Sequence, residues 1–443
     1  MTNEYRPDPD RRTGDRTYVI DPILPARGDD GPTIVRSPES ALDESVGLCA
    51  AIELNVVGAE TIFVNKPRPA TLVGRGVLER LADQVKDLEL DLIVFDTDLT
   101  PGQQRNLERE SGCKVIDRTG LILEIFGARA RTAEGRLQVE LAHLQYQRSR
   151  LVRSWTHLER QRGGAGFLGG PGESQIELDR RMIDTKIIRL KKDLDNVRRT
   201  RTLHRKPRQA TPFPVIALVG YTNAGKSTLF NQLSGADVFA EDLLFATLDP
   251  TMRSIKLPDG RPVIMSDTVG FIADLPTHLV AAFQATLEEV TEADIVLHVQ
   301  DAAQPDRQAQ AQDVLQILDS LGIDIENADR LVNVFNKVDL LSDEQKAQLT
   351  LDAEADGLAH VTLSALQAEG LDSLAEVIAE KLAIGRETLE VSLPLSDGQG
   401  IAWLYQRGDV LSREDDEEGL CRLVVRLDPA DAGRWRKKMS EEN

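Results

Sequence analysis

The chain has 443 residues, 41% of them hydrophobic, and a net charge of −20 at pH 7. Its length suggests about three domains, and no run approaches the roughly 18 apolar residues that indicate a membrane span. The first ten residues are too polar for a secretory signal. The three cysteines, Cys49, Cys113 and Cys421, lie too far apart to indicate a disulfide framework or a zinc site. We therefore expect a cytoplasmic protein without membrane insertion, with a monomer favoured.

The first part of the chain predicts a tail followed by a small domain. Residues 1–36 are rich in Asp, Arg, Pro and Gly, a composition typical of a disordered tail. Residues 37–130 alternate between helix and strand patterns, with strands expected at 70–74, 92–95 and 114–117. This alternation predicts an N-terminal α/β domain with a mostly parallel sheet. Gly74 and Gly76 lack the rest of a dinucleotide-binding pattern, so a tight turn is the favoured interpretation.

Residues 131–208 have the pattern of a helical hairpin. One apolar seam runs from Leu137 to Leu158, interrupted only by Arg148, and a second runs from Met182 to Val197, both at spacings of three and four. A helix over residues 132–162 would be about 45 Å long. Between the seams, residues 163–172 are rich in glycine and include Phe167 and Leu168. A structural hairpin would end in a short polar turn, so this tip favours a flexible probe that enters a narrow site.

Charge is distributed unevenly along the chain. Residues 145–208 carry 17 Lys or Arg against 7 Asp or Glu, a balance of +10, whereas the rest of the chain carries −30. A basic segment in an acidic protein indicates contact with a polyanion such as RNA. The alternative is an ordinary solvated helical face.

A phosphate-binding loop follows the apolar run 215–219. Its spacing is Gly-x-x-x-x-Gly-Lys-Ser, in which the glycines let backbone amides surround a β-phosphate at the start of a helix. Lys226 can reach the β- and γ-phosphate oxygens, and the Ser227 hydroxyl can bind Mg²⁺. The expected nucleotide-binding residues here are Gly220, Tyr221, Thr222, Asn223, Ala224, Gly225, Lys226, Ser227 and Thr228.

Two further segments are expected to contact the phosphates. Asp267 ends a second predicted strand, where its carboxylate can hold Mg²⁺ through water, and the Gly270 amide can face a γ-phosphate. Thr247 is our choice for the threonine that completes the Mg²⁺ shell, with Thr251 as a rival. The metal ligands expected are thus Ser227, Thr247 and Asp267. The segments themselves comprise Phe245, Ala246, Thr247, Leu248 and Asp249, and Asp267, Thr268, Val269 and Gly270.

The apolar run 331–335 leads to a motif for guanine, made of Asn336, Lys337, Val338 and Asp339. A carboxylate at Asp339 can accept hydrogen bonds from N1–H and the exocyclic amine of guanine, a donor pair that adenine lacks. Asn336 would tie this loop to the phosphate loop, and the Lys337 stem would cover the ring. A backbone amide in the following loop, formed by Ser364, Ala365 and Leu366, could bond to guanine O6. The motifs predict a GTPase with a G domain over residues 213–385.

Catalysis in this G domain needs a substitute for a missing side chain. Phe271 stands where Ras-like GTPases carry a glutamine that orients water, so intrinsic hydrolysis should be slow, on the order of 10⁻⁴ to 10⁻² s⁻¹. Asn223 resembles the asparagine of GTPases that recruit K⁺, although it could equally close the loop through a backbone hydrogen bond. The residues expected to act in catalysis are Lys226, Asn223, Thr247 and Gly270.

Strands at 389–395 and 420–427 around a helix at 399–406 predict a small α+β C-terminal domain over residues 388–443. The predicted fold class is therefore α/β. A P-loop G domain is preceded by a small α/β domain with an antiparallel coiled-coil arm and is followed by a small α+β domain.

With these motifs, the chain resembles the HflX-type GTPases. The resemblance rests on the segments 220–228, 245–250, 267–272 and 336–339 of the G domain, and on 95–104, 117–119 and 169–173 before it. The resemblance covers residues 41–382, and the tip residues Phe167 and Leu168 and the acidic C-terminal region depart from it. It implies GTP hydrolysis with Mg²⁺, binding to the large (50S) ribosomal subunit and its rRNA, and separation of the subunits of stalled ribosomes. We find no trustworthy motif for a second, ATP-linked activity.

Two other functions share the same motifs. A GTPase of ribosome assembly or RNA modification would bind assembly intermediates rather than mature particles. A signalling switch that acts on a protein partner would show no salt-sensitive RNA binding.

Overall fold

The computed structural model describes residues 14–25, 36–161, 171–205, 213–235, 244–245, 251–273, 284–323, 330–355, 357–384, 386–416, 419–427 and 429–442. The chain forms two compact units. The first comprises Met1–Arg253 with Ile264–Gly370, and the second comprises Ser254–Val263 with Leu371–Asn443. No helix among the described residues is long and apolar enough to cross a membrane.

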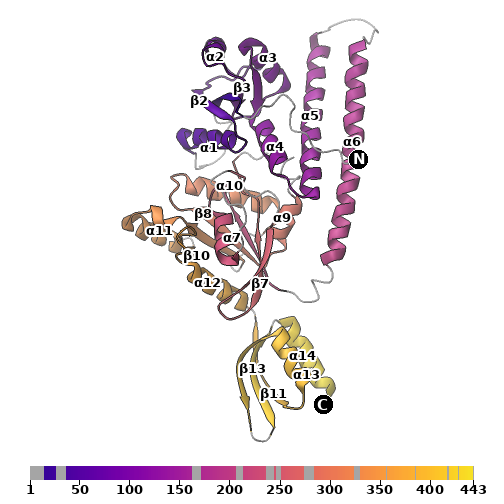
Figure 1. The fold of residues 1–443 in the computed structure, drawn as a ribbon, viewed down its shortest axis with the longest axis vertical. Helices are drawn as coiled ribbons and strands as arrows, with labels where there is room; N and C mark the ends of the chain where they lie inside the picture. Colours follow the sequence, from indigo (N-terminus) through magenta and orange to yellow (C-terminus); the bar gives the residue numbers. More distant parts are fainter. Residues whose placement is uncertain are drawn as a thin grey trace. The chain divides into compact units, whose positions relative to one another are not determined.

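A four-stranded parallel sheet begins the first unit (Figure 1). Its strands are β1 (Arg16–Ile23), β2 (Asn55–Phe63), β3 (Leu92–Phe95) and β4 (Lys114–Asp117), in the order β2-β1-β3-β4. The expectation of a disordered tail over residues 1–36 is therefore wrong for β1, which lies inside the sheet. The strand expected at 70–74 is also wrong, since that segment is a turn closed by a bridge between Arg68 and Leu72.

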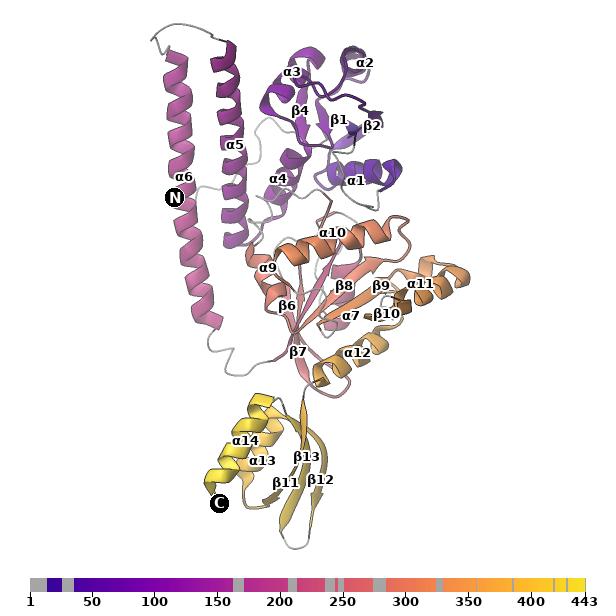
Figure 2. The same cartoon turned by 180° about the vertical axis from the view of Figure 1, so that it is seen from behind.

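Helices cover both faces of this sheet, as Figures 1 and 2 show for α1 (Pro38–Ala50) and α4 (Arg118–Arg129) on one face and α2 (Arg75–Asp87) and α3 (Pro101–Ser111) on the other. Alternate residues of β1 explain the arrangement, because Ile20 packs into the core under α2 and α3 whereas Val19 packs into the core under α1 and α4. Local signals set the ends of α3. Thr100 and Gln103 form a capping box, and Gly112 closes the helix at φ +72°.

The two long helices α5 (Ala133–Gln161) and α6 (Pro171–Arg205) lie side by side and antiparallel (Figures 1 and 2). The predicted seam is confirmed by a cluster of Leu137, Leu141, Leu144, Ile183, Ile187 and Leu190. Arg148, the polar interruption of the first seam, pairs with Asp184 across the two helices at 2.8 Å. Residues 163–170 of the tip, including Phe167 and Leu168, lie outside the described residues. The last two tip residues, Pro171 and Gly172, belong to α6.

The second sheet of this unit has six strands in the order β10-β9-β8-β5-β7-β6. They are β5 (Val215–Gly220), β6 (Thr251–Lys256), β7 (Pro262–Asp267), β8 (Ile295–Asp301), β9 (Leu331–Asn336) and β10 (Ala359–Thr362). All but β6 are joined by parallel pairings. The accompanying helices are α7 (Lys226–Ser234), α9 (Gln284–Thr291), α10 (Arg307–Ser320), η2 (Val338–Leu340) and α11 (Asp343–Ala355). Because parallel strands end at one edge, the loops after β5, β7 and β9 meet there.

The second unit contains α12 (Leu371–Ala383), β11 (Glu387–Pro394), α13 (Gly398–Arg407), β12 (Asp409–Asp415), β13 (Leu420–Leu427) and α14 (Pro429–Glu442). The strands form an antiparallel sheet in the order β11-β13-β12. Alternate residues of β13, such as Leu423 and Val425, pack into a core with Leu404 of α13 and Trp435 of α14. Trp403 and Trp435 stack with ring centroids 5.3 Å apart. The predicted strands and helix are all present, whereas β12 and α14 were not predicted.

Candidate nucleotide-binding site

The loop between β5 and α7 has a backbone that requires glycine at two positions. Gly220 has φ +149° and Gly225 has φ +89°. A Cβ added to Gly220 would lie 2.1 Å from the Val299 carbonyl oxygen, and one added to Gly225 would lie 2.1 Å from the side-chain nitrogen of Asn336. Asn223 adopts φ +60°, a left-handed conformation that asparagine tolerates well. The loop is therefore curled tightly enough to direct its amides at a phosphate group.

Lys226 is buried at the start of α7, and its ammonium donates to the carbonyl oxygens of Gly220 at 3.1 Å and Tyr221 at 2.7 Å. Burial lowers the pKa of Lys226 to about 8, and Lys337 adds to the effect while Asp267 opposes it. The charge is thus held by carbonyl groups of the loop itself. Phosphate oxygens are stronger acceptors for this ammonium than those carbonyl groups.

The oxygen atoms of Ser227 and Asp267 lie beside the start of α7. The Ser227 hydroxyl donates to Asp267 Oδ2 at 2.7 Å, and Asp267 is fully buried at the end of β7. A hydroxyl and a carboxylate at this separation are hard oxygen donors, which fit Mg²⁺. Among the described residues no group of three or more His, Cys, Asp or Glu side chains could hold a metal ion.

The segment that precedes β6 is only partly described. Ala246, Thr247, Leu248 and Asp249 lie outside the described residues, whereas the rival Thr251 begins β6. Phe245 is buried, and its ring meets that of Phe126 on α4 edge to face at 4.8 Å. Its side chain therefore faces the core shared with the N-terminal sheet.

Asn336 joins the loops after β5, β9 and β10, of which the sequence predicts only the link to the phosphate loop after β5. Its side-chain amide donates to the Ala224 carbonyl at 2.8 Å, and its side-chain oxygen accepts from the Ala365 amide at 2.9 Å. The Ser364 amide donates to the carbonyl of Glu369. In this loop, the amide of Leu366 is thus the one that makes no hydrogen bond within the described part of the chain.

The remaining residues of the β9 loop present an acceptor. Lys337 pairs with Asp301 at 2.8 Å. Asp339 Oδ1 is buried and has no hydrogen-bond partner among the described residues. A buried carboxylate oxygen without a donor is costly unless a ligand supplies one. The amino and imino groups of guanine are donors of that kind.

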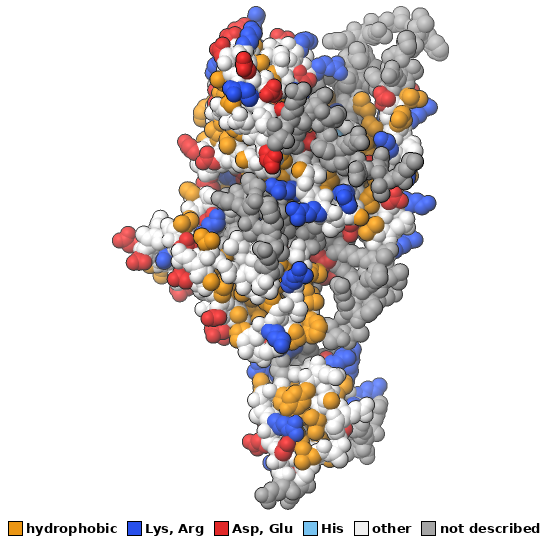
Figure 3. Space-filling view, in the orientation of Figure 1, with side chains coloured by type: hydrophobic (Ala, Val, Ile, Leu, Met, Phe, Trp, Pro, Cys, Tyr) orange, Lys and Arg blue, Asp and Glu red, His pale blue; other side chains and the backbone are white. Residues whose placement is uncertain are grey.

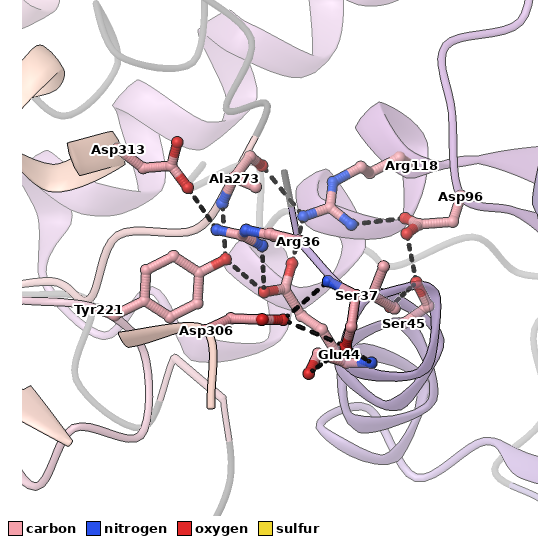
Figure 4. Close-up of polar contacts among 12 residues, drawn as sticks. Arg36, Ser37, Glu44, Ser45, Asp96, Arg118, Tyr221, Ala273, Asp306 and Asp313 are labelled. Atoms are coloured by element: carbon pink, nitrogen blue, oxygen red, sulfur yellow. Dashed lines mark hydrogen bonds and ion pairs between the residues drawn. The ribbon is translucent and has the colours of Figure 1, made fainter. Parts of the chain in front are cut away.

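Tyr221 directs its side chain away from the loop and toward α1 (Figure 4). Its hydroxyl accepts from the Ala273 amide at 2.8 Å and donates to Glu44, while the Arg36 guanidinium lies 4.8 Å from the ring centroid. Burial and then Glu44 raise the pKa of Tyr221 well above its usual value. The tyrosine backbone, rather than its side chain, therefore belongs to the phosphate loop.

A second arginine reaches the same region from α4 (Figure 4). Arg118 pairs with Glu44 and Asp96 and donates to the Ala273 carbonyl at 3.0 Å. Burial opposes the charge of Arg118, but the two carboxylates outweigh it and raise the pKa of the guanidinium. Sequence reasoning missed this group of residues because Arg36 was assigned to a tail and Glu44 belongs to no motif. The motifs that contain Asp96 and Arg118 do not show what these side chains contact. The segment that follows Gly270 is thereby tied to the N-terminal sheet.

The fold and the site define the class of protein. A Gly-Lys-Ser loop after β5, an aspartate after β7 and an Asn-Lys-x-Asp motif after β9 meet at one edge of a parallel sheet, which is the arrangement of a P-loop GTPase. Four family models match the chain. They describe a GTP-binding GTPase N-terminal region (residues 39–127), a GTP-binding GTPase middle region (129–208), a 50S ribosome-binding GTPase (215–337) and the HflX C-terminal domain (350–443).

Similar proteins cover nearly the whole chain. A GTPase HflX of Magnetococcus marinus is 49% identical over 93% of this chain and 94% of its own length. One of Escherichia coli strain K12 is 43% identical over 85% and 86%. The crystal structure of a GTP-binding protein from Sulfolobus solfataricus in complex with GDP is 23% identical, with a TM-score of 0.44 over 83% of this chain and 98% of that chain. The chain belongs to the HflX family of GTPases. The expectation that its C-terminal region departs from the family is wrong, because the HflX C-terminal model matches it.

Proposed function

We propose that this GTPase binds the 50S ribosomal subunit and its rRNA in the cytoplasm, as a monomer, and that ribosomes stimulate its GTP hydrolysis to split or rescue stalled particles. The match of residues 215–337 to a model described as a 50S ribosome-binding GTPase supports this proposal. The observation that carries it is the charge of the arm.

The outer face of α6 is rich in exposed cations. Blue side chains follow the edge of the arm on the right of Figure 3, over α6. Among the side chains of this helix that the structure describes, the exposed basic ones are Arg180, Arg181, Lys186, Arg189, Lys191, Lys192 and Arg199. The Arg189 side chain is 85% exposed. Exposed cations along one helix suit the phosphate backbone of RNA, which each cation contacts by releasing counterions.

In this proposal the nucleotide is held by the loops at the edge of the six-stranded sheet. Lys226 and the amides of residues 220–228 bind the phosphates, Asp339 and the Leu366 amide read guanine, and Gly270 faces the γ-phosphate. Ser227, Asp267 and Thr247 hold Mg²⁺, which neutralises charge on the β- and γ-phosphate oxygens. Phe245, Ala246, Leu248 and Asp249, with Thr268 and Val269, complete the nucleotide-binding segments.

Asn223 is proposed to recruit K⁺ beside the phosphates. Its side chain is exposed and makes no hydrogen bond within the described residues, which argues against the loop-closing alternative. Turnover in K⁺ should exceed turnover in Na⁺ several-fold, and Asn223→Ala should remove the difference. Equal rates in the two salts for the unaltered protein would show that Asn223 has no such role.

The ribosome proposal is tested by co-sedimentation with 50S, 30S and 70S particles over a range of salt concentrations. Reversing three charges together, in Arg189→Glu, Lys192→Glu and Arg199→Glu, should weaken 50S binding at least about tenfold and reduce its salt dependence. Arg75→Glu is the control, since this side chain is 84% exposed on α2, outside the arm. Binding that survives the triple reversal would contradict the proposal.

The tip is tested separately from the basic face. Replacing residues 163–172 with a short Gly-Ser turn leaves both helices and their charges, so 50S binding should persist while subunit splitting is lost. Equal splitting by the shortened protein would make the tip a passive connector. Preference for assembly intermediates over 70S particles would favour the alternative role in ribosome assembly or RNA modification. Absence of any salt-sensitive RNA binding would favour a signalling switch.

A further inference from the structure

Thr222 carries a buried hydroxyl that no described residue satisfies. The residue is 6% exposed, and Oγ1 has no hydrogen-bond partner within the described part of the chain. Its backbone is held firmly, because the Thr222 amide donates to the Phe271 carbonyl at 2.8 Å. An unsatisfied buried hydroxyl costs on the order of 1–3 kcal/mol, so its presence in a phosphate loop calls for a ligand.

The side chain of Thr222 lies where the γ-phosphate must be bound. A Cβ built on Gly270 would be 2.9 Å from Thr222 Cγ2 and 3.0 Å from the Lys226 ammonium nitrogen. The three residues therefore converge on one point. Oγ1 and Cγ2 are attached to the same carbon atom, so the hydroxyl belongs to a side chain that lies beside both Gly270 and the Lys226 ammonium. Those two residues are the ones expected to contact a γ-phosphate.

The residue that follows Gly270 has no side chain suited to this task. Phe271 occupies the position after Gly270, is 1% exposed and has no polar side-chain atom. Its amide donates to the Gly220 carbonyl at 3.1 Å, which fixes the residue against the phosphate loop. Water must be oriented by some group that both accepts and donates a hydrogen bond. A threonine hydroxyl does both.

We propose that Thr222 is a catalytic residue of the GTPase reaction, in which its hydroxyl accepts a hydrogen bond from the attacking water and donates one to a γ-phosphate oxygen. The water oxygen forms the bond to the γ-phosphorus, and the bond to the β,γ-bridging oxygen breaks with its electron pair going to GDP. The proton of the water passes to the phosphate product, and Thr222 ends the cycle unchanged.

The test compares two conservative substitutions of Thr222. Thr222→Val keeps the branched shape and removes the hydroxyl, whereas Thr222→Ser keeps the hydroxyl and removes the methyl group. Single-turnover hydrolysis and the affinities for GTP and GDP are measured for each. Thr222→Val should lower the hydrolysis rate on the order of 10- to 100-fold while both affinities change less than threefold, and Thr222→Ser should stay within about threefold of the parent.

The controls separate chemistry from packing. Thr119→Val removes another buried hydroxyl, which bonds to Asp98 at 2.6 Å in the N-terminal sheet, and should leave the hydrolysis rate unchanged. The Thr222→Val effect should also be the same in K⁺ and in Na⁺. An unchanged rate in Thr222→Val, an equal loss in Thr222→Ser, or a loss explained wholly by weaker GTP binding would overturn the proposal.

Discussion

Two mostly parallel sheets lie in the same unit of this protein, and their carboxyl edges differ in whether the protein supplies partners for the acceptor oxygens. At the edge of the N-terminal sheet, the protein supplies partners for its own carboxylates. Asp117 receives hydrogen bonds from the Tyr146 hydroxyl at 2.6 Å and from Arg150 at 2.5 Å, and Asp96 pairs with Arg118. At the edge of the six-stranded sheet, Thr222 Oγ1 and Asp339 Oδ1 are buried and unsatisfied within the described part of the chain.

The contrast distinguishes a structural polar cluster from a binding site. Both edges are acidic and both are buried, so acidity and burial alone do not indicate a ligand. A cluster with internal cations has little to gain from an added nucleotide, whereas unsatisfied acceptors and donors beside a glycine loop gain hydrogen bonds from one. The N-terminal edge accordingly offers no support for a second nucleotide site.

We call the carboxyl edge of the six-stranded sheet the open edge, because it holds buried oxygen atoms without partners. The largest effect should come from removing its cation, Lys226. Lys226→Ala should weaken binding of both GTP and GDP on the order of 100-fold or more, because the phosphates lose a charge-assisted partner. The melting temperature should not fall, since the buried ammonium has its pKa lowered to about 8 by its surroundings and is costly to bury. Fluorescent-nucleotide titration and a thermal melt measure the two quantities. Retained affinity would remove Lys226 from the site.

We call the carboxyl edge of the N-terminal sheet the closed edge, because the protein supplies partners for its carboxylates. A substitution there should lower the stability of the fold rather than the affinity for a ligand. Arg118→Met leaves the buried carboxylate of Asp96 without its cation and removes one of the two arginines that pair with Glu44, which costs on the order of 3–5 kcal/mol. Urea denaturation followed by circular dichroism should show the loss. The matched control is Arg75→Met, whose exposed ion pair with Glu79 should contribute less than about 1 kcal/mol. Equal stabilities of the two variants would show that the cluster is not structural.

A smaller effect is expected at Asp21, which belongs to the closed edge but lies near Asp96. Burial, followed by Asp96, raises the pKa of Asp21 to about 6, against an opposing effect of Arg118. The folded protein therefore binds a proton more tightly than the unfolded chain, and it loses stability as pH rises from about 4 to about 6. Asp21→Asn should be more stable than the parent by about 1–3 kcal/mol above pH 6, with no gain below pH 4. The exposed Asp87→Asn should show no such dependence in the same denaturation series.

The two regions also differed in how far they could be predicted. The motifs of the open edge are short and contiguous because each follows one strand, so the sequence alone placed Lys226, Asp267 and Asn336 at the ends of strands of one sheet. The strand β1 was missed because Asp21 and Pro22 interrupt it and its flanks have the composition of a disordered tail. The edge strand β12 was missed because most of its residues are charged or polar.

Contacts between distant residues that no motif or seam indicates could not be predicted from the sequence. Arg118 meets Glu44 and Ala273 only because α1, α4 and the segment after β7 come together in the fold. The same limit applies to Thr222, whose neighbours in the sequence do not reveal that its hydroxyl is left without a partner. The unsatisfied atom is visible only once the packing of Gly270 against the phosphate loop is known.

The most direct test of the open edge is base selection by Asp339. Asp339→Asn replaces an acceptor for the amino group of guanine by an amide that suits the C2 carbonyl of xanthine. We predict that competition titration with GTP and xanthosine triphosphate will show GTP binding weakened on the order of 100-fold and xanthosine triphosphate becoming the preferred ligand. A variant that still prefers GTP would contradict the assignment of this edge as the guanine site.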